Sequence, residues 1–389
     1  MVFFLFFINI IIWVINIRKK FDYILLFSIV GLCLFGLMMI YSSSSIWAEY
    51  KFNNSFHYVT NQFIFFVVGL FLMLVVSKIN YNYYYKYSNI ILLICFILLV
   101  LVLIPGIGSV RNGSRSWFGI GGLGIQPSEA AKIGLIIFTS KYLSINDKYI
   151  KSFFKGVCPI LLVVLIFFGL IMLQPDLGTG VILFLSIISI LFIAGVNLKF
   201  FIFGGVIGII GVVILILIAP YRMNRITSFI NPWEDALGTG FQIIQSLYAI
   251  GPGGLLGTGY LNSIQKHFYL PEPQTDFIFS IICEEFGVVG SIIVVGLFLI
   301  VFYRGIKIAL TCSDSFAKYL CFGILFQLIF QTIMNLFVVV GIIPVTGVAK
   351  KWGTILIVVF FFILKGFIKF ECIRKIAKTR KKIKIIKII

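Results

Sequence analysis

Three carboxylates fall where an apolar segment of membrane-spanning length begins. Asp276, Glu284 and Glu285 lie in or just after the stretch 270–279, in a chain that has only 13 Asp and Glu among 389 residues. An ionisable side chain at the edge of a bilayer, or inside it, is costly and is by default a hypothesis for a functional site. On a helix, Asp276 and Glu284 share one broad face, whereas Glu285 points elsewhere. A structural ion pair, or a helix N-terminus capped by Asp276, is the competing interpretation.

A second pair of charges opens another apolar segment. Glu129 and Lys132 are three residues apart in the stretch 126–132, and this spacing places both on the same face of a helix. Pro127 suits the first turn of that helix, where its missing N–H costs nothing. The spacing leaves two interpretations open, a pair that only neutralises itself and a pair that contacts a substrate.

Two further segments carry arginines that suit an anionic ligand. Arg115 lies in the segment 106–125, and Arg222 and Arg225 lie in the segment 220–275. Because a guanidinium binds phosphate through two parallel N–H bonds, these cations together with Asp276 predict a site for a headgroup that carries phosphate. Arginines that only contact lipid headgroups are the alternative.

The segment 220–275 is too long for a simple connection between neighbouring helices, and long loops of this kind are usually functional. Its stretch 241–250 places Gln245 and Ser246 on one polar stripe with Gln242, which predicts a short interfacial helix. The glycine-rich run 251–259 either brings backbone amides to a phosphate or acts as a hinge. The sequence has no GxxxxGK[ST] motif and no GxGxxG motif after a predicted strand, so ATP-driven transport has no support.

Composition defines the class of the protein. Hydrophobic residues make up 61% of the chain and charged residues 12%, and the mean hydropathy is +1.12, which predicts an all-α polytopic membrane protein. A bilayer is spanned by about 20 apolar residues in a helix. Runs of this kind predict about ten transmembrane helices, at 21–43, 58–79, 87–105, 126–145, 156–173, 178–197, 199–219, 276–303, 316–342 and 352–370. The apolar run at 2–17 is a further candidate, which has the length of a signal-like segment but lacks a small-residue cleavage site. An extra span and a misassigned start of the chain are both open.

The positive charges orient these spans. The net charge of +19 sits mainly in short basic clusters between spans, at 18–20, 141–155, 304–307 and in the tail. If the spans alternate, these clusters fall on one side, which is therefore cytoplasmic. The segment 220–275 then becomes a large extracytoplasmic loop between spans seven and eight. The chain divides into an apolar extension at 1–20, a transmembrane domain at 21–370 and a basic cytoplasmic tail at 371–389.

Neither nucleic acid nor a protein-bound metal is predicted from the residue types. The basic clusters orient spans and do not form a nucleic-acid signature. The seven Cys lie mostly within apolar spans and form no CxxC pair, and two His are too few for a His-based metal centre.

Five spaced motifs, taken together, resemble the SEDS family (shape, elongation, division and sporulation). They are RNGSRSW at 111–117, QPSEAAK at 126–132, QPDLGT at 174–179, the loop 222–260 and LPEPQTDFIF at 270–279. The resemblance runs from about residue 21 to Gly347. Within the family, YSSSS at 41–45, NGSRSW at 112–117 and PEPQTD at 271–276 are more similar to the FtsW/SpoVE branch than to RodA.

The resemblance implies a ten-span glycosyltransferase of the bacterial cell membrane. Such an enzyme polymerises lipid II, a disaccharide peptide linked to undecaprenyl diphosphate, into peptidoglycan strands for cell division or sporulation. Its usual partner is a class B penicillin-binding protein, a transpeptidase that crosslinks the strands. By motif, Asp276 matches the catalytic Asp of the family. Arg115, Trp117, Glu129 and Lys132 match conserved positions in its outer loop and membrane cavity.

The expected chemistry agrees with these residue types. Growth of a β-1,4 glycan from an α-linked diphosphate donor inverts the anomeric carbon, and a carboxylate acts as general base on the acceptor hydroxyl. The departing diphosphate needs charge compensation from arginines, from a divalent cation such as Mg²⁺ or Mn²⁺, or from both. We therefore expect Asp276 to be the base, with further substrate-binding residues at Arg115, Trp117, Glu129, Lys132, Arg222, Arg225, Gln245, Ser246 and Glu284.

One region departs from the family pattern. After PVTG at 344–347 the family continues into a motif of the type PFxSYGG, whereas this chain reads VAKKWGT and then a Phe-, Ile- and Lys-rich end. Two alternatives to the polymerase follow. One is a flippase or scramblase of lipid II, whose signature would be polar residues that continue across the bilayer. The other is a catalytically impaired scaffold of the division complex, favoured if the altered region abolishes catalysis.

Overall fold

The regular structure is almost entirely helical. The computed structural model describes residues 22–344, apart from 77, 112–113, 120–123 and 219. Within this part of the chain, seven helices are long and apolar enough to cross a membrane. The predicted class, an all-α polytopic membrane protein, is confirmed. Regular strands in the described part form one short antiparallel pair, β1 (Ser109–Arg111) and β2 (Ser114–Trp117).

Nine of the predicted spans coincide with helices of the described residues. These are α2 (Tyr23–Phe52), α3 (His57–Val76), α4 (Asn82–Leu103), α5 (Pro127–Ile145), α6 (Cys158–Met172), α7 (Leu177–Ala194), α8 (Leu198–Ile218), α11 (Ile278–Thr311) and α12 (Ser315–Val339). Two short helices, α9 (Pro220–Ile230) and α10 (Phe241–Ile250), lie in the predicted outer loop. The predicted extension at 1–20, the tenth span at 352–370, the tail at 371–389 and the departure after Gly347 lie outside the described residues.

Local sequence explains where several helices begin. Pro127 occupies the first turn of α5, as its missing N–H predicts. Three aspartates cap other helices with their side chains, since each carboxylate accepts a backbone N–H of the first turn. They are Asp22 before α2, Asp176 before α7 and Asp314 before α12.

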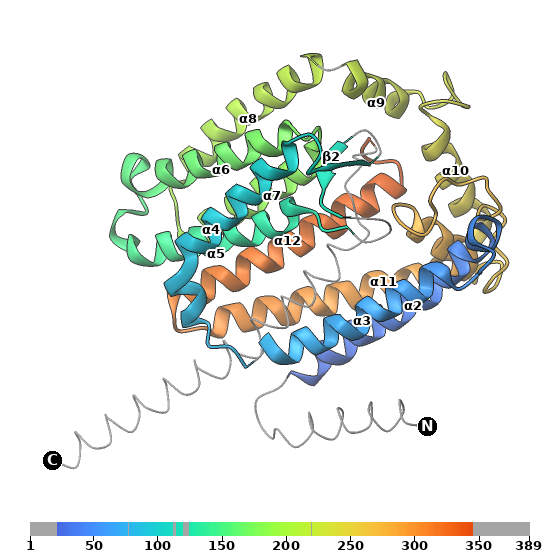
Figure 1. Cartoon of the computed structure of the whole chain (residues 1–389), viewed down its shortest axis with the longest axis horizontal. Helices are drawn as coiled ribbons and strands as arrows, with labels where there is room; N and C mark the ends of the chain where they lie inside the picture. The colour runs from blue at the N-terminus through green and yellow to red at the C-terminus, as the bar shows by residue number, and fades with distance from the viewer. Residues whose placement is uncertain (1–21, 77, 112–113, 120–123, 219, 345–389) are drawn as a thin grey trace, which may run out of the picture.

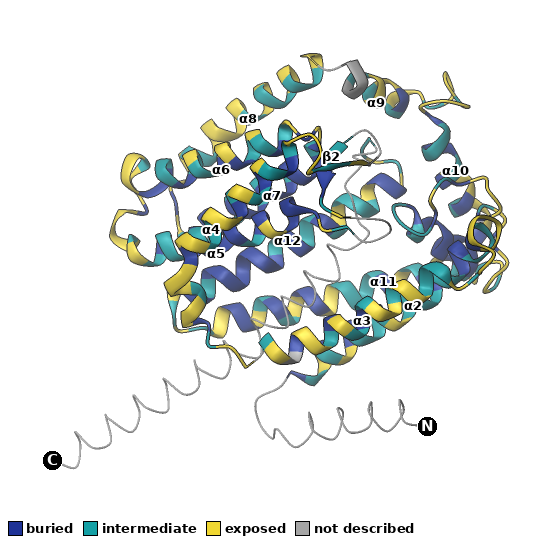
Figure 2. Cartoon of the chain, in the orientation of Figure 1, coloured by how far each residue is buried: buried dark blue, intermediate teal, exposed yellow. Residues whose placement is uncertain are grey.

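The helices form two groups with α12 between them (Figure 1). Helices α2, α3 and α11 run side by side along one flank, and α4, α5, α6 and α7 form the other. Helix α12 packs against α5, α7 and α11. A Cβ at Gly323 of α12 would collide with the side chains of Ile136 of α5 and Ile190 of α7, so this glycine allows the three helices to pack closely. The buried core therefore follows α5, α7 and α12, which Figure 2 shows in dark blue.

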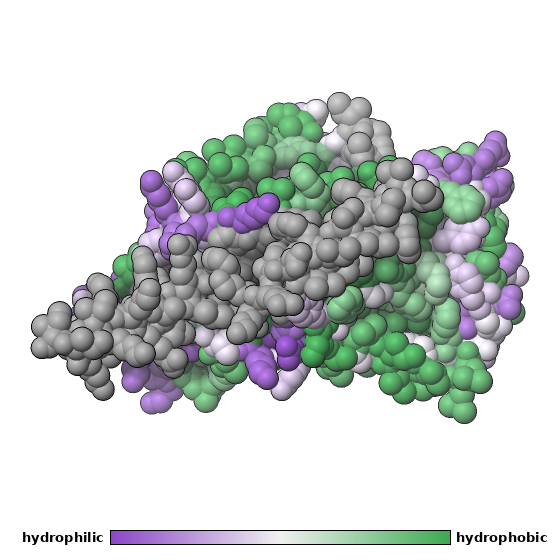
Figure 3. Space-filling view, turned by 90° about the horizontal axis from the view of Figure 1, so that it is seen from below, coloured by the Kyte–Doolittle hydropathy of each residue, from purple (hydrophilic) through white to green (hydrophobic). Residues whose placement is uncertain are grey.

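Helix α8 differs from the rest because every one of its residues is at least partly exposed. Its sequence is apolar on all sides, and such a helix is stable where lipid surrounds it. The same pattern holds for the visible surface of the bundle. Figure 3 shows hydrophobic side chains along the flanks of the helices and hydrophilic side chains gathered towards both ends.

Helices α2 and α11 are joined by polar contacts near both of their ends. At the predicted cytoplasmic end, Arg304 Nη2 lies 2.8 Å from Asp22 Oδ2. Near the other end, the Ser42 hydroxyl donates to Glu285 Oε1 over 2.6 Å. The outer end of α11, where the predicted catalytic segment lies, is thus fixed to α2.

Candidate active site

Helix α11 is interrupted at Gly287, one of the glycines of its apolar sequence. Gly287 has φ 59° and ψ −156°, a backbone conformation that side-chain-bearing residues rarely adopt. The interruption frees backbone groups on both sides of it. The N–H groups of Val288 and Val289 donate to the carbonyls of Gly254 and Leu255, over 3.0 and 3.1 Å. The glycine-rich run of the outer loop thus inserts into the broken helix.

The same run satisfies the carbonyls before the break. The N–H of Thr258 donates to the carbonyl of Glu284 over 2.9 Å, and the N–H of Gly259 donates to that of Glu285 over 3.0 Å. A Cβ at Gly257 would collide with the Glu285 carbonyl, and Gly257 also has φ +83°. These glycines therefore allow the backbone of the run to approach α11 closely. The amides of residues 258 and 259 are used within the protein, which leaves them unable to cradle a phosphate.

The Glu284 carboxylate is buried beneath the outer loop. It accepts hydrogen bonds from the Ser263 hydroxyl over 2.6 Å and from the N–H groups of Ile264 and Gln265 over 2.7 and 3.4 Å. Only 1% of Glu284 is exposed. This side chain holds the backbone of the loop.

The neighbouring carboxylate, Glu285, pairs with a lysine of the same loop. Lys266 Nζ lies 3.0 Å from Glu285 Oε1, and it also donates to the Ser42 hydroxyl over 3.3 Å. All three side chains are buried. Sequence analysis did not predict this pair, because a separation of 19 residues across a loop carries no periodic signal. Lys266 is therefore committed to Glu285.

Asp276 lies in a turn two residues before α11 begins at Ile278. The prediction that Asp276 and Glu284 share one helical face is therefore wrong, since only Glu284 is in the helix. Asp276 is half-buried. Two anchors fix the segment around it, because Leu270 and Phe277 are 2% and 1% exposed and pack in one apolar cluster.

The short helix predicted at 241–250 is confirmed as α10. The Ser246 hydroxyl lies 2.7 Å from that of Ser280 and donates to the carbonyl of Val339 over 2.7 Å. Ser246 is fully buried, whereas Gln245 is half-buried. Ser246 thus joins α10 to the beginning of α11 and the end of α12.

Glu129 and Lys132 form the ion pair that their spacing predicts. Lys132 Nζ lies 2.8 Å from Glu129 Oε1, and both side chains are buried at the first turns of α5. The neighbouring Gln126 donates to Asp176 Oδ2 over 3.1 Å, which connects α5 to the beginning of α7. Burial raises the pKa of the Asp176 carboxyl, and the hydrogen bond that it accepts from the N–H of Thr179 opposes this effect. The pair therefore belongs to a larger polar cluster.

Two buried glutamines that sequence analysis did not single out lie on α12, Gln327 and Gln331. They follow Gly323 by one and two turns, towards the end of α12 that carries Val339. Among the described residues, neither side chain has a hydrogen-bond partner. The four-residue spacing of these two polar residues in an apolar segment is the sequence pattern that indicates them.

The predicted arginines occupy separate elements. Arg115 is part of β2 and donates to the carbonyl of Leu103 over 3.4 Å, and Trp117 of the same strand is 5% exposed. Arg225 is exposed on α9. Arg222 also belongs to α9, but its side chain lies outside what the structure describes.

Arg225 lines a polar cavity of about 360 Å³. The cavity lies between α9 and α10, and Pro271 of the Asp276 segment contributes to its wall. Ser228, Thr239 and Gln242 add polar atoms to the lining. This is where the structure brings a predicted phosphate-binding residue next to the segment that carries Asp276.

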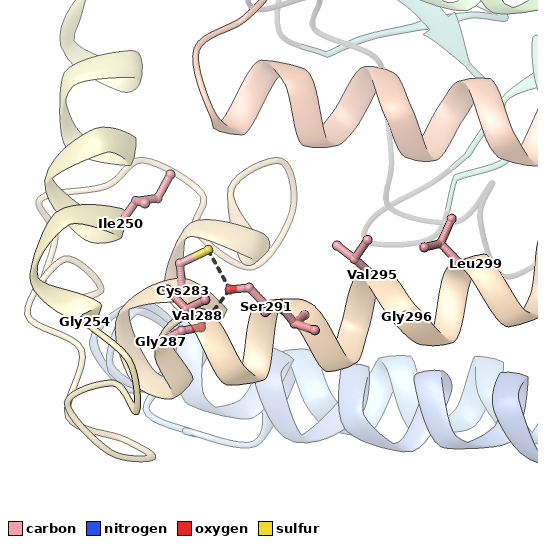
Figure 4. A pocket seen from close by; sticks show the side chains of 10 residues that line it. Ile250, Gly254, Cys283, Gly287, Val288, Ser291, Val295, Gly296 and Leu299 are labelled. Carbon is pink, nitrogen blue, oxygen red and sulfur yellow. Dashed lines mark hydrogen bonds between the residues drawn. The ribbon is translucent and has the colours of Figure 1, made fainter.

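A second cavity, of about 420 Å³, lies beside the break in α11 (Figure 4). Ile250, Val288, Val295 and Leu299 contribute to its largely apolar wall. Ser291 contributes a hydroxyl, which donates to the carbonyl of Gly287 over 2.8 Å and lies 3.2 Å from Cys283 Sγ. The lining suits a hydrocarbon chain.

The acidic residues do not form a metal site in the part of the chain that the structure describes. There, no group of three or more His, Cys, Asp and Glu is placed to hold a metal ion. Glu284, Glu285 and Asp176 accept hydrogen bonds from protein donors. The donor set in this region does not fit a divalent cation held by the protein.

Comparisons with known proteins agree on one group of relatives. A family model named for FtsW, RodA and SpoVE, and described as a cell cycle protein, matches residues 23–370. Stage V sporulation protein E of Bacillus subtilis is 49% identical over 313 residues, 80% of this chain and 86% of that protein. A probable peptidoglycan glycosyltransferase FtsW of Trichlorobacter lovleyi is 38% identical over 330 residues, 85% of this chain and 87% of that protein.

Solved structures show the same fold. A chain from a study of the structural coordination of polymerization and crosslinking by a peptidoglycan synthase complex is similar with a TM-score of 0.73 and 26% identity. That similarity covers 91% of this chain and 99% of the other. The rod shape determining protein RodA of Thermus thermophilus is similar in fold, with a TM-score of 0.64, 23% identity and coverage of 90% and 97%.

Proposed function

Because the chain belongs to the FtsW, RodA and SpoVE family of cell cycle proteins, we propose that it is a peptidoglycan glycosyltransferase that polymerises lipid II. Its site lies at the outer face of the bacterial cell membrane, and its role is in cell division or sporulation. The name of the relative from T. lovleyi supports the activity, and the name of the relative from B. subtilis supports a sporulation role.

The observation that carries this proposal is the placement of Asp276. Its carboxylate is half-buried in a turn before a membrane helix, between the buried anchors Leu270 and Phe277. A general base needs such a fixed position, because proton transfer requires hydrogen-bond reach to the reacting group. The base accepts the proton of the acceptor hydroxyl as that oxygen bonds to the anomeric carbon. The bond from that carbon to the diphosphate oxygen then breaks, and the diphosphate leaves with the electron pair.

Charge compensation for the diphosphate falls to the cations around this segment. Arg225 lines the polar cavity that Pro271 also lines, so this cavity is the proposed diphosphate site. Arg222 belongs to the same helix, and Arg115 and Trp117 lie on β2 near the outer end of α5. The apolar cavity beside the α11 break is the proposed place for the polyprenyl chain. The proposed compensation comes from arginines, because the described residues place no group of three or more metal-ligating side chains together.

The remaining predicted site residues divide by their contacts. Glu129 and Lys132 form a buried ion pair at the start of α5, and the proposal is that this pair contacts the substrate headgroup. Gln245 is half-buried on α10 and keeps its proposed contact with substrate. Ser246 and Glu284 are fully used in internal hydrogen bonds, so the proposal gives them the role of holding the site together.

One observation favours a second candidate function, transbilayer movement of lipid II. Buried hydroxyls without a hydrogen-bond partner among the described residues continue beyond the ion pair, at Thr139 and Ser140 of α5 and Ser88 of α4. They extend the polar interior towards the predicted cytoplasmic side. Most of the buried charged residues of the described part nevertheless lie towards the predicted outer side, which favours the polymerase. They are Glu129, Lys132, Asp176, Lys266, Glu284 and Glu285.

The deciding experiment uses purified full-length chain with its class B penicillin-binding protein, the proposed partner. Fluorescent lipid II is supplied, and glycan strands are separated by length. Strand formation by the wild-type chain that is lost in Asp276→Asn supports the polymerase. Lipid movement across vesicles without strand formation would support the second candidate instead. A chain that does neither, while its partner remains bound, would support the scaffold.

A further inference from the structure

We propose that Ser42, Lys266 and Glu285 form a buried strap that positions Asp276. The inference rests on the proposed function, because it takes Asp276 as the reacting base. None of the three strap residues is proposed to touch substrate. They act through the backbone segment that carries Asp276, and they are therefore positioning residues.

The contacts of the strap are specific and enclosed. Lys266 Nζ lies 3.0 Å from Glu285 Oε1 and 3.3 Å from Ser42 Oγ, and Ser42 donates to the same carboxylate oxygen over 2.6 Å. The N–H of Ser263 adds a third donor to that oxygen at 3.3 Å. Exposure is 4% for Lys266, 1% for Glu285 and 0% for Ser42. Such enclosed and mutually bonded groups have few alternative geometries.

Stability alone does not explain a pair of this kind. Removing two charges from water costs several kcal/mol per ion, and well-packed apolar residues are often at least as stabilising as a buried ion pair. The benefit of the pair is then its geometry, which is fixed by charge and by hydrogen-bond direction. A chain with 13 acidic residues places one of them at this position.

The strap fixes one end of the segment that carries Asp276. Lys266 precedes the segment, and Phe277, which is 1% exposed, closes it at the beginning of α11. Glu285 is part of α11, the helix at which the segment ends. The ion pair therefore joins the start of the segment, at Lys266, to that same helix. A loop closed at both ends has a smaller range of conformations, and misplacement of a reacting group by about 1 Å can cost about a hundredfold in rate.

The strap and the loop that carries it pack against helix α2. Ser42 belongs to α2, and two contacts around it bring the same loop to that helix. The Tyr260 hydroxyl donates to the carbonyl of Met38 over 3.2 Å. The ring of Phe268 lies 5.2 Å from that of Trp47 in an edge-to-face arrangement. The position of Asp276 is thus set by α2 as well as by α11.

The test compares three variants of the strap, Lys266→Met, Glu285→Gln and the double variant, in the full chain bound to its partner. The two single variants leave a buried group unpaired, and the double variant removes both charges. Hydrogen exchange of the amides at 267–276 reports the order of the segment, and kcat and KM for lipid II polymerisation report its chemistry.

We expect amide exchange at 267–276 to rise about tenfold or more in all three strap variants, and kcat to fall about tenfold to a hundredfold with KM little changed. The double variant should regain the thermal stability that the single variants lose, because it leaves no buried charge unpaired. Its kcat should stay as low as that of the single variants. Wild-type exchange and wild-type kcat in the double variant would overturn the proposal.

Arg304→Met is the matched control, because it breaks the ion pair that joins α11 to Asp22, the cap of α2, at the far end of the two helices. It should lower thermal stability and leave exchange at 267–276 and kcat unchanged. An equal rise in exchange in this control would overturn the proposal, since it would show general loosening of α2 and α11. If the wild-type chain forms no glycan, the proposed function fails, while the exchange measurements still decide whether the strap orders the segment.

Discussion

The hydroxyl oxygens of Ser246 and Ser280 lie 2.7 Å apart, which joins α10 of the outer loop to the first turn of α11. Ser280 follows Asp276 by four residues. The turn that carries the proposed base therefore leads into a helix start that the serine pair and the docked glycine-rich run both hold. The outer loop acts as part of the membrane domain and not as a free connection.

Replacement of Asp276 by Asn should abolish glycan polymerisation without loss of folded protein. The amide preserves the size of the side chain but cannot accept the proton, and loss of a general base typically costs about a hundredfold to ten-thousandfold in rate. The measurement is the initial rate of strand formation with the partner present. Glu234→Gln, a change at an exposed position of the same outer loop, is the control. Near wild-type polymerisation by Asp276→Asn would show that this aspartate is structural.

Removal of one member of the Glu129–Lys132 pair should destabilise the protein more than removal of both. A single change leaves a buried charge without its partner, at a cost of about 3–5 kcal/mol. The free energies of unfolding of Glu129→Gln, Lys132→Met and the double variant form the cycle that measures the coupling. Additive losses across the cycle would mean that the two charges act independently.

Replacement of Gly257 by Ala should detach the glycine-rich run from α11. The new Cβ would collide with the Glu285 carbonyl, and the positive φ of this position adds strain of about 1–3 kcal/mol. Faster amide exchange at residues 257–259 is the expected result. Gly251→Ala is the matched control, because a Cβ there has nothing within 4 Å. Equal protection of these amides in both variants would contradict the docking.

The predicted topology places the outer loop and the segment 141–155 on opposite sides of the membrane. A cysteine at Leu237, which is 91% exposed, should react with an impermeant maleimide in intact cells. A cysteine at Lys148 should react only after the membrane is opened. The reverse pattern would invert the orientation and remove Asp276 from the outer face.

Chelation should distinguish a cation that binds together with the substrate from a cation that the protein itself holds. Because the described donor set does not fit a protein site, we expect the thermal unfolding temperature of the chain without substrate to be unchanged by a chelator. If chelation lowers the rate of polymerisation, added Mg²⁺ or Mn²⁺ should restore it. The concentration needed should rise with that of lipid II. A lowered unfolding temperature after chelation would reveal a resident cation.

The sequence predicted most of the helices because the bilayer restricts the options. A segment within hydrocarbon must satisfy its backbone hydrogen bonds internally, so length and apolar composition suffice to find it. The Glu129–Lys132 pair was predictable for a similar reason, since three-residue spacing on a helix leaves the two side chains as neighbours.

The details of the outer loop were not predictable in this way. The break at Gly287 occurs inside an apolar run, where a glycine alone does not reveal a change of backbone conformation. Lys266 meets Glu285 only because the loop folds back onto α11. Asp276 lies outside the helix because the chain is still in a turn there, so helical spacing did not apply to it.

The two polar contacts between α2 and α11 are separated by a defined distance along the helices. They are twenty residues apart on α2, from Asp22 to Ser42, and nineteen apart on α11, from Glu285 to Arg304. At helical rise the distance along α2 is about 30 Å, which is the thickness of the hydrocarbon core of a typical bilayer. Glu285 and Arg304 of α11 lie beside the two ends of this stretch, although the break at Gly287 interrupts the helical rise of α11. Charged groups resist entry into hydrocarbon, so each contact stays at its own interface. A bilayer much thicker or thinner than this must deform around the helix pair, and lipid chain length therefore acts directly on the two helices that hold the loop proposed to be catalytic.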